Sequence, residues 1–183
     1  KKNFFKEDDR LGGKDIYSAS KAASEILCES YFQSFLKSKK IYLDTARAGN
    51  IIGGGDFGKD RIIPDIIKSI KKKIKFFVRS PNSIRPWQHI YDVCYGYMLI
   101  PLNQKKRSIF KKSWNFGPNK NQSDYKVKEI VNLFSKSFNK KFKYSIKKVK
   151  FKESKYLMLN NSNSKKFLKW RPIYNFTDGI KET

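Results

Sequence analysis

A tyrosine and a lysine lie four positions apart near the start of the chain, at Tyr17 and Lys21. In an α-helix this spacing places both side chains on the same face. The positive charge of Lys21 and the positive end of a starting helix favour the ionised form of the Tyr17 phenol. A phenol tuned in this way can take a proton from a substrate hydroxyl near neutral pH. The pair therefore predicts the acid–base chemistry of dehydrogenases and their relatives.

The residues around this pair distinguish it from a chance match. Small residues surround it and would let a flat cofactor lie against the helix: Ser18, Ala19, Ser20, Ala22 and Ala23. An apolar helical stripe continues beyond it through Ile26, Leu27, Tyr31, Phe35 and Leu36. The same spacing recurs at Tyr144 and Lys148, but there apolar and polar residues alternate as on a strand. The alternative interpretation of Tyr17 is an exposed tyrosine at a helix start.

Hydrophobic periodicity predicts strands that alternate with helices. We expect helices over residues 18–37, 62–72, 90–102, 127–138 and 163–168, the third of them stopped near Pro101. Strands are expected over residues 41–46, 76–78, 113–116 and 142–149. Residues 6–15 and 47–58 are rich in turn formers and are expected to be loops. This alternation predicts an α/β fold with a parallel sheet.

The net charge of +25 raises the possibility of nucleic-acid binding. Of the 41 basic residues, 34 are Lys and only 7 are Arg, and the Lys are spread along the whole chain. Base-reading proteins rely on the bidentate Arg fork, which is scarce here. A compositional drift toward Lys, Asn and Ile explains the charge without any ligand. A basic nucleic-acid-binding module therefore stays as the alternative from another functional class, and it predicts binding that weakens steeply with salt.

Cysteine and histidine contents argue against a disulfide framework and a zinc site. Cys28 and Cys94 both fall within helical patterns, which suits a reducing cytosol. His89 is the single histidine and there is no Cys-x-x-Cys motif, so we expect no metal. The longest apolar run, residues 97–102, is too short to span a bilayer, and no signal peptide is recognised. We therefore expect a cytoplasmic, globular chain of about one domain or a large part of one.

The run Gly53-Gly54-Gly55-Asp56-Phe57-Gly58 satisfies the spacing Gly-x-Gly-x-x-Gly of a dinucleotide fingerprint. About twenty residues later, where an acidic group should hold the ribose, the chain has Phe77, Val78 and Arg79. The run also lies after the Tyr17–Lys21 pair. We therefore reject it as the cofactor fingerprint and expect its glycines to let the backbone bend around a substrate.

With these segments placed, the chain resembles the extended short-chain dehydrogenase/reductase family, and within it the CDP-glucose 4,6-dehydratases. The Tyr17–Lys21 motif is typical of the whole superfamily, whereas the glycine-rich run and residues 85–89 narrow the resemblance to this subgroup. The matching runs occur in the family's order and span almost the whole chain: 10–13 (RLGG), 17–21 (YSASK), 46–56 (ARAGNIIGGGD), 61–65 (RIIPD), 85–89 (RPWQH), 115–118 (NFGP) and 170–172 (WRP).

The resemblance implies NAD as cofactor and a reaction in three steps. Tyr17 would deprotonate the 4-hydroxyl of the sugar while hydride passes to NAD, and Lys21 would hold the nicotinamide ribose. Loss of water across carbons 5 and 6, followed by return of the hydride to carbon 6, would give a 4-keto-6-deoxy sugar. Ala48 and Gly49 would also lie against the cofactor.

The resemblance also implies a nucleotide-sugar site. Asn50 and Arg85 would hold the diphosphate, since a guanidinium binds two phosphate oxygens at once and an amide adds a neutral donor. The other expected substrate contacts are Arg61, Trp87 and His89, with residues 76–79 beside the nucleobase. The alternatives are a surface ion pair for Arg85, for instance with Asp92, and plain packing for Trp87 and His89.

The family pattern also indicates what these residues do not contain. The first half of the dinucleotide-binding domain is missing, together with the Thr/Ser-x-Asp-Lys-like segment that assists water loss. We expect residues 1–58 to be the latter part of the NAD-binding domain and residues 59–183 to be mainly the nucleotide-sugar domain, with residues 113–118 returning to the first sheet. The chain is thus expected to be a C-terminal fragment that binds NAD poorly and is inactive alone.

Substrate and oligomeric state stay open at this stage. CDP-glucose is the expected substrate, and the alternative is a dehydratase or epimerase of the same family that acts on a UDP-, dTDP- or GDP-sugar. Relatives form dimers through the helix that carries the tyrosine. Ile26, Tyr31 and Phe35 are compatible with such a homodimer and equally with an ordinary core.

Overall fold

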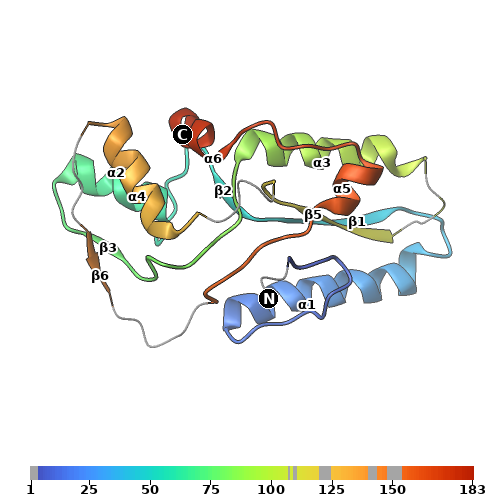
Figure 1. Ribbon diagram of the computed structural model, residues 1–183. Helices are drawn as coiled ribbons and strands as arrows, with labels where there is room; N and C mark the ends of the chain where they lie inside the picture. Colours follow the sequence, from blue (N-terminus) through green and yellow to red (C-terminus); the bar gives the residue numbers. More distant parts are fainter. Residues whose placement is uncertain (1–3, 107, 109–110, 120–124, 140–143, 148–153) are drawn as a thin grey trace.

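Helices and strands alternate along the chain in the computed structural model (Figure 1). The structure describes residues 4–106, 108, 111–119, 125–139, 144–147 and 154–183. The helices are α1 (Ile16–Tyr31), the π-helix η1 (Phe32–Leu36), α2 (Ile62–Lys72), α3 (Ile90–Gln104), α4 (Val127–Ser137), α5 (Ser162–Phe167) and α6 (Phe176–Glu182). The strands are β1 (Leu43–Ala48), β2 (Asn50–Ile52), β3 (Phe76–Val78), β4 (Trp87–His89), β5 (Lys111–Phe116) and β6 (Tyr144–Ile146). The pairs β1–β5, β2–β4 and β3–β6 are all parallel, which confirms the predicted α/β class.

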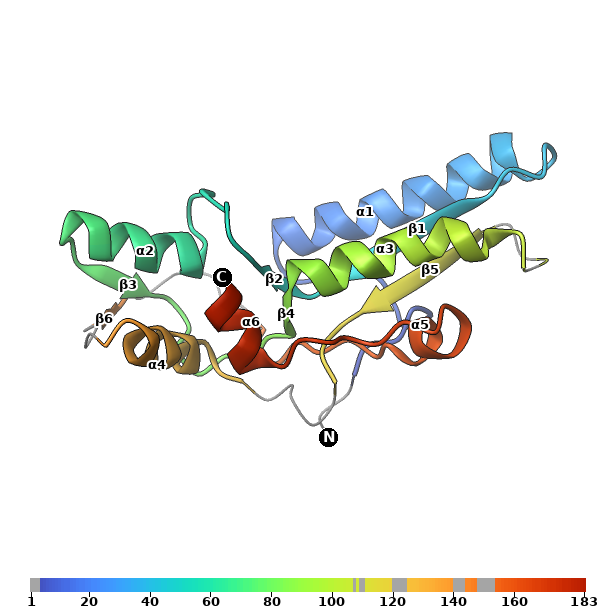
Figure 2. The same cartoon turned by 90° about the horizontal axis from the view of Figure 1, so that it is seen from above.

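The longest strand pair, β1–β5, lies between two helices. It pairs in register from Leu43 with Lys111 to Ala48 with Phe116. Figures 1 and 2 place α1 on one face of this pair and α3 on the other. Side chains alternate accordingly, since Phe116 packs toward α3 while Thr45 bonds to α1. The first turn of α1 lies at the end of β1 from which β2 continues (Figures 1 and 2).

Gly49 joins this pair to the next one. Its backbone N–H donates to the carbonyl oxygen of Phe116 at 3.2 Å, and the N–H of Asn50 donates to the carbonyl oxygen of Pro86 at 2.9 Å. The chain therefore passes directly from the β1–β5 pair into the β2–β4 pair. A Cβ atom at position 49 would lie 2.1 Å from the Pro86 carbonyl oxygen, so only glycine fits this close approach.

A hydrophobic core lies where α2, α4, α6 and the β3–β6 pair meet. Its buried side chains come from α2, α4, α6, β3, β2 and β4. They are Ile52, Ile63, Ile66, Phe76, Val78, Trp87, Ile130, Val131, Phe134, Phe176 and Ile180. Tyr144 of β6 packs against them. The strand interpretation of this second tyrosine is thus confirmed for residues 144–146, while Lys148 and the other predicted strand residues, 142–143 and 148–149, lie outside the described residues.

One predicted loop is partly wrong. Residues 47–58 do not form a continuous loop, because β1 extends to Ala48 and β2 follows immediately after Gly49. Pairing with β5 and β4 gives these backbone groups the partners that a loop lacks. The partner strand β4 was not predicted at all, since three residues are too few for periodicity to reveal.

The third helix, predicted over residues 90–102 with a stop near Pro101, runs two residues further, to Gln104. A proline removes one backbone donor but permits the rest of the last turn. Side chains stabilise that turn, since Asn103 Nδ2 donates to the Leu99 carbonyl and Gln104 Nε2 donates to Asp44 Oδ2, both at 2.8 Å.

The C-terminal segment returns onto α3 and β4 through one buried carboxylate. Asp92 accepts the backbone N–H groups of Ile173 at 2.8 Å and Tyr174 at 3.1 Å. Burial raises the pKa of Asp92, although these N–H groups and nearby His89 oppose the rise. The ring of His89 packs against Tyr174, with ring centroids 4.5 Å apart.

We predict that Gly49→Ala destabilises the fold strongly. The added methyl group meets backbone that cannot swing away, so the two strand pairs must separate at a cost of about 3 kcal/mol or more. Gly54→Ala is the matched control, because the nearest atom to its Cβ would be the Thr183 carbonyl oxygen at 3.9 Å. Urea unfolding of the three proteins measures the difference. Equal midpoints for Gly49→Ala and wild type would contradict the role given to Gly49.

We predict that stability falls as the pH drops through about 6.5 because of His89. Its side chain is 2% exposed, and Nε2 has no hydrogen-bond partner among the described residues. Burial lowers the pKa of His89 from 6.5, although Asp92 and Glu182 oppose the shift. The folded state therefore binds a proton less readily than the unfolded state, and stability is lost below the unfolded pKa. Thermal unfolding between pH 8 and pH 5 should show a flatter profile for His89→Phe, and parallel profiles would contradict this assignment.

Candidate active site

Tyr17 and Lys21 lie side by side on the first two turns of α1. Asp15 begins the helix as its N-cap, accepting the backbone N–H of Ser18 at 2.9 Å and its hydroxyl at 2.7 Å. These hydrogen bonds lower the pKa of Asp15. The Lys21 ammonium lies 5.5 Å from the centre of the Tyr17 ring. Tyr17 is 71% exposed, so its phenol faces outward with the lysine beside it.

Polar contacts hold α1 against the sheet. Glu25 accepts two hydrogen bonds from Arg47 of β1, at 2.9 Å from Nε and 2.8 Å from Nη2, and a third from the Thr45 hydroxyl at 2.9 Å. Burial alone would raise the pKa of Glu25, but the hydrogen bonds from Arg47 and Thr45 lower it overall. The hydrogen bond to Glu25 raises the pKa of Arg47. Further along the helix, Glu29 pairs with Lys111 of β5.

The ion pair between Glu25 and Arg47 was not predicted from the sequence. The available signal was the spacing, since Glu25 follows Lys21 by four residues on the same helix face. The pair lines a cavity of about 340 Å³ between α1, the β1–β5 pair and the N-terminal loop, together with Glu7, Asp8, Asp9, Leu11, Ile26, Glu29, Ser30, Lys111 and Ser113.

The two residues expected to hold a diphosphate are neighbours. Asn50 begins β2 and pairs in register with Trp87, directly after the residue pair Arg85-Pro86. Arg85 Nη1 donates to the carbonyl oxygens of Ser154 at 2.7 Å and Ile84 at 3.0 Å. The Gly49 junction therefore places the start of β2 at the end of β1, near the first turn of α1 (Figure 2).

Arg61 lies in the loop that precedes α2. Its Nη1 pairs with Asp56 Oδ2 at 3.1 Å, and Asp56 Oδ1 accepts the backbone N–H of Gly58 at 2.9 Å. The glycine run thus forms a turn closed by its own aspartate. In this turn Phe57 is exposed, and the Gly58 N–H donates its hydrogen bond to the Asp56 carboxylate within the same loop.

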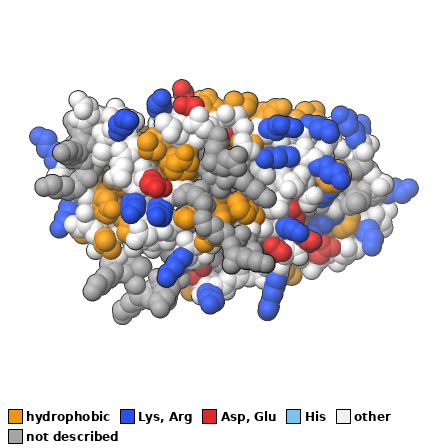
Figure 3. Space-filling model, in the orientation of Figure 1, with side chains coloured by type: hydrophobic (Ala, Val, Ile, Leu, Met, Phe, Trp, Pro, Cys, Tyr) orange, Lys and Arg blue, Asp and Glu red, His pale blue; other side chains and the backbone are white. Residues whose placement is uncertain are grey.

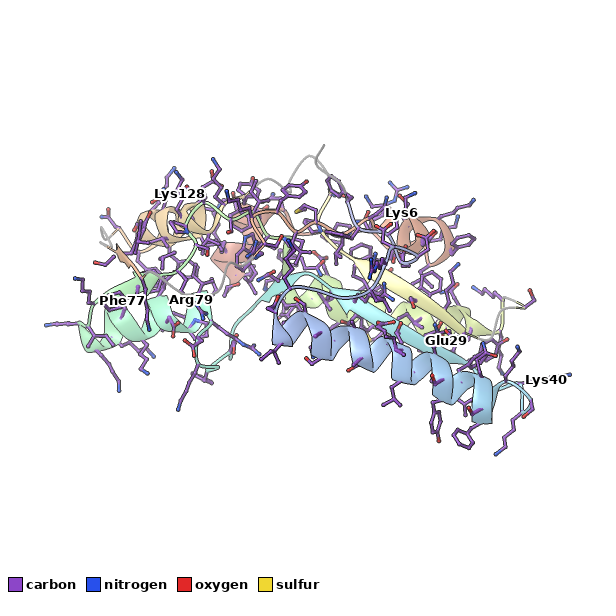
Figure 4. All side chains as sticks on the ribbon, turned by 90° about the horizontal axis from the view of Figure 1, so that it is seen from below. Lys6, Glu29, Lys40, Phe77, Arg79 and Lys128 are labelled. Atoms are coloured by element: carbon purple, nitrogen blue, oxygen red, sulfur yellow. The ribbon has the colours of Figure 1, made fainter. Side chains whose placement is uncertain are left out.

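Trp87 and His89 are buried rather than open to a ligand. Trp87 belongs to the core with Ile52 and Phe176, and His89 lies beneath Tyr174. Their burial is compatible with the packing alternative that the sequence left open. Phe77 and Arg79 of the expected nucleobase region lie at the opposite end of the molecule from Glu29 of α1 (Figure 4).

Several large apolar side chains of α1 and η1 are exposed. Ile26, Tyr31 and Phe35 are all more than half exposed, so they are not core residues of the described chain. Lys and Arg side chains are scattered over both ends of the face shown in Figure 3 instead of forming one stripe. In the described part of the chain, no group of three or more His, Cys, Asp or Glu side chains could hold a metal ion. No helix within those residues has the length and apolar character needed to cross a membrane.

Solved structures share this architecture. The chain superposes on MoeE5 in complex with UDP-glucuronic acid and NAD with a TM-score of 0.84, at 16% identity over 98% of this chain and 57% of that one. It superposes on the dTDP-glucose 4,6-dehydratase DesIV from Streptomyces venezuelae with a TM-score of 0.81, at 19% identity over 99% of this chain and 53% of that one. At these identities the likeness shows the fold alone.

Sequence comparison confirms the resemblance found above. The chain is 32% identical over 183 residues to the CDP-glucose 4,6-dehydratase of Salmonella typhimurium (strain LT2), a match that covers 96% of this chain and 51% of the relative. It therefore spans about half the length of this relative. The family model described as GDP-mannose 4,6 dehydratase matches residues 1–183. The chain belongs to the GDP-mannose 4,6 dehydratase family.

Proposed function

We propose that the protein containing this chain is an NAD-dependent nucleotide-sugar 4,6-dehydratase that converts CDP-glucose to CDP-4-keto-6-deoxyglucose. The observation that carries the proposal is the exposed Tyr17–Lys21 pair on the turns of α1 nearest the end of β1, where the N–H of Asn50 donates to the carbonyl oxygen of Pro86, the residue after Arg85. The 32% identity to a CDP-glucose 4,6-dehydratase supports the reaction type. The choice of CDP-glucose over a UDP-, dTDP- or GDP-sugar is the finer part of the proposal.

Tyr17 is the proposed base and Lys21 its partner. The phenol takes the proton of the sugar 4-hydroxyl, and the ammonium 5.5 Å from the ring centre favours the resulting phenolate. Asn50 and Arg85 hold the diphosphate and so fix the sugar relative to Tyr17. Arg61 is proposed as a further contact, while the buried Trp87 and His89 support the site from beneath.

The Tyr17 face fits a flat cofactor such as NAD. Small residues flank the pair, and the Tyr17 side chain is 71% exposed. Lys21, Ala48 and Gly49 are the residues proposed to contact the cofactor, together with Tyr17. When bound, NAD supplies the hydride acceptor for oxidation at carbon 4.

Domain boundaries and assembly follow from the same proposal. Residues 1–58 complete the NAD-binding domain, residues 59–183 form mainly the nucleotide-sugar domain, and the intact protein supplies the first half of the dinucleotide-binding sheet. The exposed Ile26, Tyr31 and Phe35 of α1 and η1 are proposed to form a homodimer contact. The cysteines are free thiols, which is compatible with the cytoplasm.

We predict that the intact protein forms a 4-keto product from CDP-glucose and not from UDP-, dTDP- or GDP-glucose or from GDP-mannose. Absorbance of the 4-keto sugar in alkali measures the product.

Tyr17→Phe should lower kcat by about 10²–10⁴-fold with little change in stability, because only the hydroxyl is lost. Product from another nucleotide sugar alone would reassign the substrate, and near-normal turnover by Tyr17→Phe would refute the base.

We predict that Arg85→Lys weakens nucleotide-sugar binding about tenfold although the charge is kept, because the lysine loses the bidentate fork. Isothermal titration with the nucleotide sugar measures this change. Arg171→Lys is the control, since Arg171 is exposed on the segment that follows Trp170. Unchanged affinity of Arg85→Lys would contradict the proposed role of Arg85 in binding the diphosphate.

A further inference from the structure

We propose that the Glu25–Arg47 ion pair positions the base: it fixes the rotation of α1 about its own axis, and thereby the direction in which Tyr17 and Lys21 face. This inference rests on the function proposed for Tyr17. Glu25 and Arg47 act through the helix, and neither of them contacts the substrate.

Within α1 itself, hydrophobic packing contributes little to this rotation, although Phe32 at the start of η1, seven residues after Glu25, is buried. No residue of α1 is fully buried. Its half-buried, sheet-facing positions are Ser18, Ala22, Glu25, Cys28 and Glu29. The large apolar side chains of α1, such as Ile16 and Leu27, are mostly exposed. An ordinary surface helix presents an apolar stripe to its sheet, whereas α1 presents mainly small and polar side chains.

The ion pair has the geometry needed to fix an orientation. Two parallel hydrogen bonds join the Glu25 carboxylate to the Arg47 guanidinium, and the Thr45 hydroxyl fixes the carboxylate from the neighbouring strand position. A bidentate pair of this kind defines direction as well as distance. The two side chains are only 14% and 21% exposed, so solvent screens their attraction less than that of a surface pair. Arg47 Nη1 also holds the carbonyl oxygen of Glu7, which ties in the N-terminal loop.

The spacing along α1 transmits this orientation to the base. At about 100° per residue, Lys21 and Tyr17 lie about 40° and about 80° around the helix from Glu25, on the same side. A rotation of about 10° moves a side-chain tip roughly 6 Å from the axis by about 1 Å. A displacement of about 1 Å between reacting groups can lower a rate about 100-fold. Arg47 precedes Asn50 by three residues, so the pair also relates the base to the end of β1.

The chain offers a matched control on the same helix. Glu29 follows Glu25 by one turn and pairs with Lys111 at the first position of β5 (Figure 4 labels Glu29). Its side chain is 45% exposed, and Lys111 lies at the end of β5 opposite Phe116. Glu29→Gln therefore removes an ion pair from α1 while the Glu25–Arg47 contact is kept.

The test compares wild type, Tyr17→Phe, Glu25→Gln, Arg47→Lys and Glu29→Gln in the intact protein. The measurements are kcat per folded molecule, KM for the nucleotide sugar, the pH–rate profile, and the melting temperature by circular dichroism. We expect Glu25→Gln and Arg47→Lys to lower kcat roughly 10- to 100-fold with KM within about twofold, and to shift the pH–rate limb that depends on Tyr17. Glu29→Gln should keep the wild-type kcat and profile.

Two different results separate failure of this inference from failure of the proposed function. If wild type turns over and Tyr17→Phe does not, Tyr17 is supported as the base. In that case, a Glu25→Gln variant with unchanged kcat and pH–rate profile and only a lower melting temperature would show that the Glu25–Arg47 pair is purely structural. An equal kcat loss in Glu29→Gln would overturn the inference as well. Inactive wild type, or fully active Tyr17→Phe, would overturn the proposed function and this inference together.

Discussion

The arrangement of the candidate site depends on the contact between Gly49 and the Pro86 carbonyl. The site lies where two parallel strand pairs meet, and they meet only because position 49 carries no side chain. The N–H of Gly49 binds the last residue of β5, and the next N–H along the chain binds Pro86. The backbone of Asn50 therefore lies beside the segment that follows Arg85, although the two residues are 35 positions apart in the sequence.

Buried polar groups connect the junction to the rest of the chain. The Asp92 carboxylate accepts the backbone N–H groups of residues 173 and 174. The backbone carbonyl oxygen of Asp92 accepts a hydrogen bond from Trp170 Nε1 at 2.9 Å. Ser164 Oγ donates to the Asn115 carbonyl oxygen at 2.6 Å. A buried carboxylate costs free energy unless such donors reach it, so these contacts define one position for the C-terminal segment. That segment in turn covers the face of β4 that carries His89.

Sequence patterns predicted the long elements well and the junction poorly. The helices over residues 62–72 and 127–138 and the strand over 76–78 are confirmed because their apolar periodicity reflects burial in one core. Long-range pairing decides the short strands β2 and β4, whose polar residues Asn50, Gln88 and His89 leave no apolar run like that of β3. The apolar stripe through Ile26 and Tyr31 has helical spacing, yet these side chains are exposed, because periodicity identifies a face and does not say what covers it. Motif spacing brought out Tyr17 and Lys21, whereas the Glu25–Arg47 pair became visible only once β1 was folded beside α1.

The exposure of Tyr17 constrains how its chemistry can work. At about 4 Å, two unit charges interact by about 1 kcal/mol in water and about 4 kcal/mol at an effective dielectric constant of about 20. With the Tyr17 side chain 71% exposed, its interaction with the Lys21 charge lies near the first limit. Covering the same ring with cofactor and sugar moves the pair toward the second limit without moving either side chain. If Tyr17 is the base, as proposed, its interaction with Lys21 therefore strengthens when the proposed ligands exclude water. This dependence favours reaction of a correctly bound substrate over reaction with solvent.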